Sequence, residues 1–232
     1  MTAPLSVDAA ILGRRSIRAF RPDPVPRAVV AEILGISARA PSGTNMQPWK
    51  AHVVTGAARH ALCTAVVAAA DAVHAGTNAE VHEAEYRYYP AQWQEPYIGR
   101  RRKVGLDMYA LLGIGKGEGA AMHAQHNRNF TFFDAPVGIF FTIDKHLEIG
   151  SWLDYGMLLQ NVMLAARARG LDTCPQAAWP RFHRILRTHL GFPESETVIC
   201  GLALGFADES AAVNSLVTDR VPLEDWTTFH GE

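Results

Sequence analysis

Two short and almost wholly apolar runs, residues 137–143 and 197–206, set the strongest constraint on how this chain can fold. Both have the length of buried strands and fall far short of a membrane span. Because the second run is apolar on both of its faces, we expect it at the centre of a sheet that is covered on each side. The first run predicts a second buried strand.

Several segments before and after these strands show the spacing of apolar residues that predicts helices. Ser6 and Asp8 offer N-cap chemistry for the first predicted helix, and Gly170 and Gly191 follow the last two. No repeat or low-complexity linker divides the chain, so the sequence predicts one α+β domain over residues 1–232, with helices flanking a mixed or antiparallel sheet. The predicted elements are helices at 7–12, 27–40, 57–74, 154–169 and 181–190, a strand at 50–55 and an extended segment at 14–20.

Residues 83–133 depart from this pattern and predict an excursion from the core. The excursion is rich in aromatic residues, and helical pieces are expected near 103–112 and 118–127. It also carries a basic run, Arg100, Arg101, Arg102 and Lys103.

Charge and cysteine content exclude several classes of protein. Lys and Arg number 22 against 23 Asp and Glu, so no global charge favours nucleic acid or an anionic membrane as a partner. The first residues lack the basic start and apolar run of a signal peptide, and a cytoplasmic location is expected. Three cysteines without a CxxC pair argue against a disulfide framework and a structural zinc. His123 and His126 could share a helix face, but without a third ligand we expect surface histidines and no metal.

The first candidate for chemistry is Arg14-Arg15-Ser16-Ile17-Arg18. In an extended segment, residues two apart share a face, so Arg14, Ser16 and Arg18 would point one way and Ile17 into the core. Two guanidiniums and a hydroxyl on one face can clamp a phosphate. A solvated basic strand edge is the alternative.

Three further segments carry polar or small residues. Residues 40–49 carry hydroxyls, amides and a glycine between two prolines. Such a segment is either a rigid loop that offers hydrogen bonds to the edge of a heteroaromatic ligand or an ordinary capped loop. Residues 170–179 predict a turn after the long helix, whose small residues would let the backbone approach a flat ligand. Cys174 within it lacks a Cys–His–Asn pattern and is expected to be a small buried residue. Arg220 follows the last strand and says nothing by itself.

In this order and spacing the four segments resemble the nitroreductase family of flavoproteins. The resemblance runs across nearly the whole chain, and the excursion resembles the aryl-nitroreductase branch. The matching segments are RRSIRAF at 14–20, APSGTNMQPW at 40–49, GLDTCPQAAW at 170–179, a late Arg-x-Pro at 220–222 and, for the branch, QEPYIGRRRKVGLDMYALLGI at 94–114.

The resemblance implies an α+β sandwich that forms an intertwined homodimer, with two FMN molecules at the subunit interface. Arg14, Ser16 and Arg18 would hold the phosphate, the ribityl chain and the pyrimidine edge, with Arg15 beside them and Arg220 completing the phosphate site. The residues that would reach the partner's flavin are Pro41, Ser42, Gly43, Asn45 and Gln47. Those that would lie along the isoalloxazine ring are Pro175, Gln176, Ala177 and Ala178.

The implied reaction is ping-pong transfer of a hydride from NADH or NADPH, through flavin N5, to a nitroaromatic or quinone-like acceptor. The cofactor does the electron chemistry and solvent can deliver protons, so no catalytic residue is assigned. Arg18 is the candidate to stabilise the reduced flavin near N1 and O2. The sequence does not choose between the two nucleotides. The excursion would cover the active site, where Tyr88, Trp93 and Phe133 either shape the substrate pocket or cover the edge of the core.

One position departs from the family pattern, because Thr218 stands where many relatives have lysine. The phosphate charge would then be met by Arg14, Arg18 and Arg220, or by an arginine of the basic run. Other functions on the same scaffold stay open: reductive dehalogenase, enal reductase, flavin-degrading enzyme or non-catalytic flavin-binding protein. A protein that recognises acidic partners through its basic run is the alternative outside the family.

Overall fold

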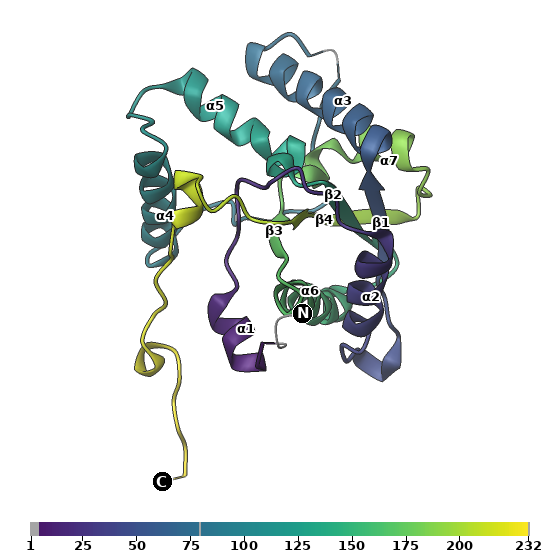
Figure 1. Cartoon of the computed structure of the whole chain (residues 1–232), viewed down its shortest axis with the longest axis vertical. Coiled ribbons are helices and arrows are strands. Elements are labelled where there is room, and N and C mark those ends of the chain that lie inside the picture. Colours follow the sequence, from purple (N-terminus) through teal and green to yellow (C-terminus); the bar gives the residue numbers. More distant parts are fainter. Residues whose placement is uncertain (1–4, 79, 232) are drawn as a thin grey trace.

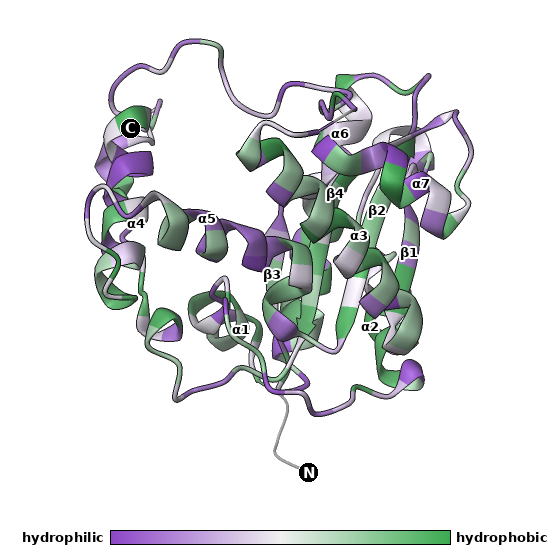
Figure 2. Ribbon diagram, turned by 90° about the horizontal axis from the view of Figure 1, so that it is seen from above, coloured by the Kyte–Doolittle hydropathy of each residue, from purple (hydrophilic) through white to green (hydrophobic). Residues whose placement is uncertain are grey.

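The computed structural model describes residues 5–78 and 80–231, and its centre is an antiparallel sheet of four strands in the order β1-β2-β4-β3 (Figure 1). The strands are β1 (Lys50–Thr55), β2 (Val137–Asp144), β3 (Asp172–Gln176) and β4 (Glu196–Gly205). Every residue of β4 is buried, as is every residue of β2 up to Ile143. The ribbons of these two strands are accordingly mostly green in Figure 2. The predicted buried strands, and the central place of the second, are confirmed.

Helices lie on both sides of the sheet (Figure 1). Phe140 of β2 points into the core under one layer, and its neighbours Ile139 and Phe141 point into the other. The predicted α+β sandwich is therefore present. The first layer contains α3 (Gly56–Ala75), α5 (Gly119–Asn127) and α7 (His183–Leu190), and the second α1 (Val7–Gly13), α2 (Arg27–Ser37) and α6 (Ile149–Arg167). None of the helices within residues 5–78 and 80–231 combines the length and apolar character that a bilayer crossing requires.

Two glycines in the central strands make room for large rings. A Cβ atom on Gly138 would lie 2.2 Å from Cζ of Phe132, and one on Gly201 would lie 2.3 Å from Cδ1 of Trp179. The two rings stack on each other with centroids 4.6 Å apart. Phe132 lies in the short 3₁₀ segment Arg128–Asp134 and has a φ of +55°, a conformation that costs a non-glycine residue about 1–2 kcal/mol. Packing of the ring over Gly138 holds the backbone in this conformation.

The predicted elements are present, but several ends differ and one prediction is wrong. The long helix begins at Ile149, and the last one is preceded by a 3₁₀ turn, Trp179–Phe182. Residues 170–179 were expected as a turn, yet Asp172–Gln176 form the edge strand β3, paired with β4. This strand has no alternation of large apolar residues, and Pro175 fits there because an edge strand tolerates a missing N–H.

The excursion carries α4 (Tyr97–Leu111), which lies apart from the main body beside the C-terminal segment (Figure 1). The helix begins at Tyr97 and not near residue 103, so the basic run lies inside it. Before α4, the chain crosses the end of the sheet where β4 begins. There the Tyr86 hydroxyl donates to the Ile199 carbonyl, and Glu85 pairs with Lys145 at 2.8 Å.

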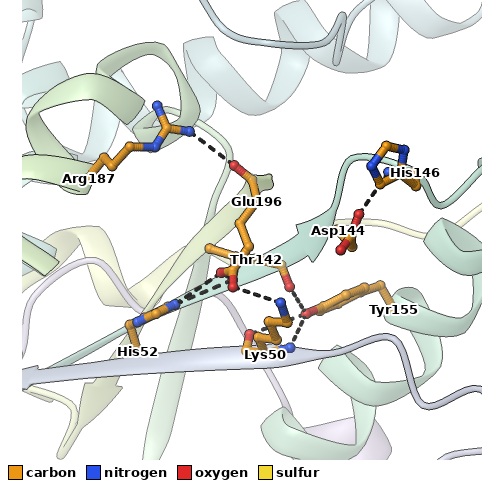
Figure 3. A network of polar contacts seen from close by, with 8 residues as sticks. All are labelled: Lys50, His52, Thr142, Asp144, His146, Tyr155, Arg187 and Glu196. Carbon is orange, nitrogen blue, oxygen red and sulfur yellow. Dashed lines mark hydrogen bonds and ion pairs between the residues drawn. The ribbon is translucent and has the colours of Figure 1, made fainter. Parts of the chain in front are cut away.

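A buried carboxylate organises the same end of the sheet (Figure 3). Oε1 of Glu196 accepts from Lys50 Nζ at 2.7 Å, and Oε2 accepts from Thr142 Oγ1 at 2.6 Å. His52 Nε2 lies 3.5 Å from Oε2. Burial by itself would raise the pKa of Glu196, but the hydrogen bonds and charge of these neighbours outweigh it and hold the pKa below its usual value. The Tyr155 hydroxyl links β1 to β2 beneath this group, accepting from Lys50 N at 2.7 Å and donating to the Thr142 carbonyl.

Candidate functional site

A cavity of about 390 Å³ at the β3 edge of the molecule collects the arginines of the first and fourth motifs. Apolar side chains of α1 and of the segment after β4 complete its wall. The polar residues that line it are Arg14, Arg15, Ser16, Arg18, Thr218 and Arg220. Ile17 between them is 2% exposed and lies in the core, as predicted for an extended segment. Positions 206 residues apart in sequence, Arg14 and Arg220, thus meet in one place.

The arginines of this cavity form no ion pair within the described residues. Within the described part of the chain, no carboxylate lies within ion-pair distance of Arg14, Arg15, Arg18 or Arg220. Burial, followed by the charge of Arg220, lowers the pKa of the Arg14 guanidinium. A guanidinium stays protonated in proteins, so the lowered pKa expresses first the cost of burying this cation and second the cost of holding it near Arg220. An anion between them would remove this cost.

Asn214 fixes the arginine segment to the chain after β4, and the sequence analysis did not identify it. Its Oδ1 accepts from the backbone N–H of Arg18 at 2.8 Å, and its Nδ2 donates to the carbonyls of Ala19 and Asp208, both at 2.8 Å. Its own carbonyl accepts from Arg15 Nη1 at 3.2 Å. The residue is buried in the short turn Ala212–Ser215. An isolated asparagine in a segment without periodicity gives no signal of this role.

The first and third motifs lie side by side. Ser16 forms a parallel bridge with Thr173, and Ile17 N donates to the Thr173 carbonyl at 3.1 Å. The first motif thus extends the sheet beyond β3. Pro175 is exposed on β3, and Ala177 and Ala178 are half-buried after it. These positions follow Thr173, the residue of β3 that pairs with the arginine segment.

Two side chains of the third motif are engaged in the core. Gln176 is 2% exposed; its Nε2 donates to the Asn129 carbonyl at 2.7 Å, and its Oε1 accepts from Trp179 Nε1 at 3.2 Å. Contact of Gln176 with a ligand therefore falls to its backbone. Burial raises the pKa of the Cys174 thiol to about 11, so the thiol stays protonated and is a small buried residue, as predicted.

The second motif lies far from the cavity within one chain. Its loop leads into β1, the edge of the sheet opposite to β3. Gly43 N donates to Asp154 of α6 at 3.1 Å, and the Ser42 hydroxyl accepts from Gln47 N at 3.0 Å. Asn45 and Gln47 have φ angles of +61° and +50°. The loop is thus held in a defined, exposed shape, but no residue of it lines the arginine cavity.

Thr218, the departure from the family pattern, orients Arg220. Nη1 of Arg220 donates to the Thr218 hydroxyl at 2.9 Å and to its carbonyl at 3.2 Å. The next residue, Asp219, lies 3.3 Å from Nζ of Lys103 on α4, which also pairs with Asp107 at 2.6 Å. Of the basic run, Lys103 thus links α4 to the segment that carries Arg220.

The residues expected to shape a substrate pocket have different environments. Phe133 is 2% exposed in the core next to Phe132 and packs under α3, which agrees with the second of the two alternatives, cover of the core. Tyr88 and Trp93 lie outside the core. The Tyr89 ring contacts Tyr88 edge-on and Trp93 at a tilt, and Arg101 lies 4.9 Å from the Trp93 ring centroid. His123 is not the free surface residue expected, because Nε2 lies 2.8 Å from Oδ1 of Asp71.

Comparison with known proteins adds similarity over the full length of the chain. The model of the Nitroreductase family matches residues 11–206. The chain is 42% identical to a chloronitrobenzene nitroreductase of Comamonas testosteroni, over 96% of each chain, and 41% identical to a 4-nitrobenzoate reductase of Pseudomonas putida, over 97% of this chain and 95% of that one. The crystal structure of the FMN and NADPH-dependent nitroreductase NfnB from Sphigopyxis sp. strain HMH superposes with a TM-score of 0.92 at 39% identity, over 98% of this chain and 100% of that one.

Proposed function

The chain belongs to the nitroreductase family, and from this membership we propose that it is an FMN-dependent oxidoreductase that uses NADPH or NADH to reduce nitroaromatic compounds. Two relatives, at 42% and 41% identity, are named chloronitrobenzene nitroreductase and 4-nitrobenzoate reductase. A similar solved structure is described as an FMN and NADPH-dependent nitroreductase. FMN, when bound, supplies the two-electron chemistry that joins oxidation of the nucleotide to reduction of the acceptor.

The unneutralised arginine cavity is the observation that carries this proposal. A phosphate dianion fits a site in which Arg14, Arg18 and Arg220 lack carboxylate partners, because charge-assisted hydrogen bonds to phosphate are strong and can be bidentate. Ser16 would add a hydroxyl donor, and Arg15 stays a candidate at the rim. Thr218 fits as the residue that aims Arg220, which makes a lysine at this position dispensable.

The flat ring of the cofactor would lie along the backbone of Pro175, Gln176, Ala177 and Ala178. These residues directly follow the point where Ser16 bridges to β3, so they continue from the phosphate site. The half-buried alanines present no bulky side chain to a planar ligand. Arg18, whose backbone N–H donates to Asn214, would stabilise the negative charge of a reduced flavin.

We further propose that the working form is a homodimer. Several apolar side chains are largely exposed in the described part of one chain, and exposed apolar patches of this kind mark protein interfaces. They lie on α1, at the start of α6 and in the C-terminal segment that extends away from the body in Figure 1: Val7, Leu12, Ile149, Leu153, Trp226 and Phe229, each between 68% and 85% exposed. A second chain would also bring Pro41, Ser42, Gly43, Asn45 and Gln47 to a flavin that their own chain cannot reach.

Finer features stay proposals: a ping-pong order, quinones as further acceptors, and a cytoplasmic location. Dehalogenation, enal reduction, flavin breakdown and flavin binding without turnover are the alternatives on this scaffold. Iodotyrosine deiodinase from Nematostella vectensis is 25% identical over 70% of its length, which is less similarity than the aryl nitroreductases have.

The test begins with the visible spectrum of the purified protein, followed by stopped-flow mixing with NADPH or NADH under nitrogen. We expect yellow protein whose absorbance bleaches with nucleotide and returns on addition of nitrobenzene. The variant Arg220→Ala should lower FMN affinity about 10-fold or more, since a hydrogen-bonded charge contributes roughly 1.5–3 kcal/mol. Arg184→Ala, an exposed arginine on α7 remote from the cavity, is the matched control.

Different failures have different meanings. Colourless protein that does not take up FMN would refute the cofactor site. Bound FMN that stays oxidised with both nucleotides would favour the binding protein without turnover. Light scattering at the gel-filtration peak should give twice the 25.4 kDa chain mass, and a monomer of full activity would refute the shared site.

A further inference from the structure

A second cavity, of about 470 Å³, lies between α3, α5 and the turn that follows β3. Its volume is in the range of small-molecule sites. Ala177 and Ala178 form part of its wall, so it borders the surface proposed to carry the cofactor ring. The cavity combines an aromatic wall with a basic one. The aromatic wall consists of Tyr89, Phe130 and Phe182. The basic wall consists of His74, His123, His126 and Arg181.

Arg181 is the cation of this cavity that is free to bind an anion. Its Nε donates to the His82 carbonyl at 2.9 Å, which fixes the guanidinium while leaving both terminal amino groups available. Among the residues that the structure describes, no carboxylate forms an ion pair with it. The nearby Asp71 is occupied, because its Oδ1 accepts from Asn127 at 2.6 Å and lies 2.8 Å from His123.

His126 is the second anion ligand that the cavity offers. Its ring packs edge-on against Phe130, with centroids 5.6 Å apart. Burial, then the charges of His123 and Arg181, lower the pKa of His126. A bound anion would oppose the effect of Arg181, so binding and protonation of this imidazole favour each other.

We propose that this cavity binds the anionic substituent of an aromatic acceptor, such as the carboxylate of a nitrobenzoate, with Arg181 and His126 as its ligands and the aromatic wall against its ring. The proposal rests on the proposed function, since the nitro group must reach the cofactor beside Ala177 and Ala178. Arg181 lies three residues after Ala178 in a 3₁₀ turn, a rise of roughly 6 Å, which is comparable with the length of a para-substituted benzene.

The experiment compares two acceptors that differ only in charge, 4-nitrobenzoate and its methyl ester. With NADPH and the FMN-loaded enzyme, Arg181→Gln should lower kcat/KM for the acid by about 10- to 100-fold, the effect of a lost charge-assisted hydrogen bond. The same variant should leave kcat/KM for the ester within about twofold. Arg181→Lys should restore part of the activity with the acid, and Arg184→Gln, on the exposed side of α7, should change neither acceptor.

Each other result overturns the proposal. An equal loss with both acceptors would mean that Arg181 only supports the segment around His82. No loss with either would place the carboxylate elsewhere. A rise in KM for NADPH with an unchanged acid-to-ester ratio would assign the cavity to a nucleotide phosphate. If NADPH bleaches the flavin of the wild-type enzyme, and the enzyme reduces the ester but not the acid, only the inference about this cavity is refuted. If the enzyme reduces neither acceptor, the proposed function is refuted as well.

Discussion

The buried carboxylate of Glu196 allows a stability prediction that the structure makes quantitative (Figure 3). The variants are Glu196→Gln, Lys50→Met and their combination. Glutamine keeps the shape but presents an N–H₂ group to one of the two donors, Lys50 Nζ or Thr142 Oγ1, and that donor loses its acceptor. Methionine keeps the length of Lys50 but leaves the buried carboxylate without its cation.

The expected magnitude follows from the burial of each partner. Two hydrogen bonds to a buried charge contribute roughly 1.5–3 kcal/mol each. The Lys50 side chain is 47% exposed, so solvent screens its pairing with Glu196 and its bond belongs at the low end of that range. We expect each single variant to lower the free energy of unfolding by about 2 kcal/mol, or the melting temperature by roughly 4–8 °C. The double variant should lose about 1 kcal/mol less than the sum.

Thermal and urea unfolding at fixed protein and FMN concentration measure these effects. Asp23→Asn is the matched control, because it breaks the Arg21–Asp23 pair at a similar distance of 2.9 Å but with both side chains about half exposed. That change should stay within about 0.5 kcal/mol. Additive losses in the double variant, or an Asp23→Asn effect as large as that of Glu196→Gln, would refute the role assigned to the buried network.

The pH dependence has a defined sign. Since the folded-state pKa of Glu196 is held below its usual value, its contribution is present above the unfolded pKa, about 4.3, and is lost as pH falls through the folded value. The difference in stability between wild type and Glu196→Gln should therefore shrink between pH 6 and pH 3.5. A difference that grows on acidification would contradict the assigned pKa shift.

Two further substitutions probe the packing of the sheet. Tyr155→Phe should lower the free energy of unfolding by about 1–3 kcal/mol in urea titrations, because the buried Lys50 N–H and Thr142 carbonyl lose their shared hydroxyl partner; an unchanged midpoint would show that water replaces it. Gly201→Ala should lower the free energy of unfolding by about 3 kcal/mol or more, since its Cβ would lie 2.3 Å from Trp179. Gly35→Ala, at an exposed position of α2 with no atom within 4 Å of the added Cβ, should be neutral or stabilising.

The parts of the fold that could be predicted are those whose residues report a local environment. The apolar character of residues 197–206 on both faces predicts a central strand, and helical spacing with a following glycine predicts the helix that ends near Gly170. β3 could not be found this way: Asp-Thr-Cys-Pro-Gln is polar and contains proline, and only pairing with β4 makes it a strand. Its conformation is set by tertiary contacts, which outweigh local propensity.

The same distinction applies to the candidate site. Spacing within 14–18 predicted that Ile17 points inward and the polar residues together outward, because the chain itself supplies that geometry. Nothing in the sequence connects Asn214 to Arg18, or Lys103 to Asp219, since these contacts join segments more than a hundred residues apart. For Phe133 the sequence left two alternatives for a related reason: an aromatic residue near an excursion can face either a pocket or the core, and only the structure shows that it lies in the core.

Ordered groups that lack a counter-charge or a covering surface within the described part of the chain are the strongest indication of function here. A stable core satisfies its polar atoms, as Glu196 and Gln176 do within the described structure. The arginines of the β3 edge and the exposed loop at the opposite edge are held in defined shapes by Asn214 and Asp154, yet within the described residues the arginines have no carboxylate partner and the loop is not covered. Groups of this kind are candidates for binding something outside their own chain. We therefore expect an anion to bind the arginines and the surface of a second chain to contact the loop.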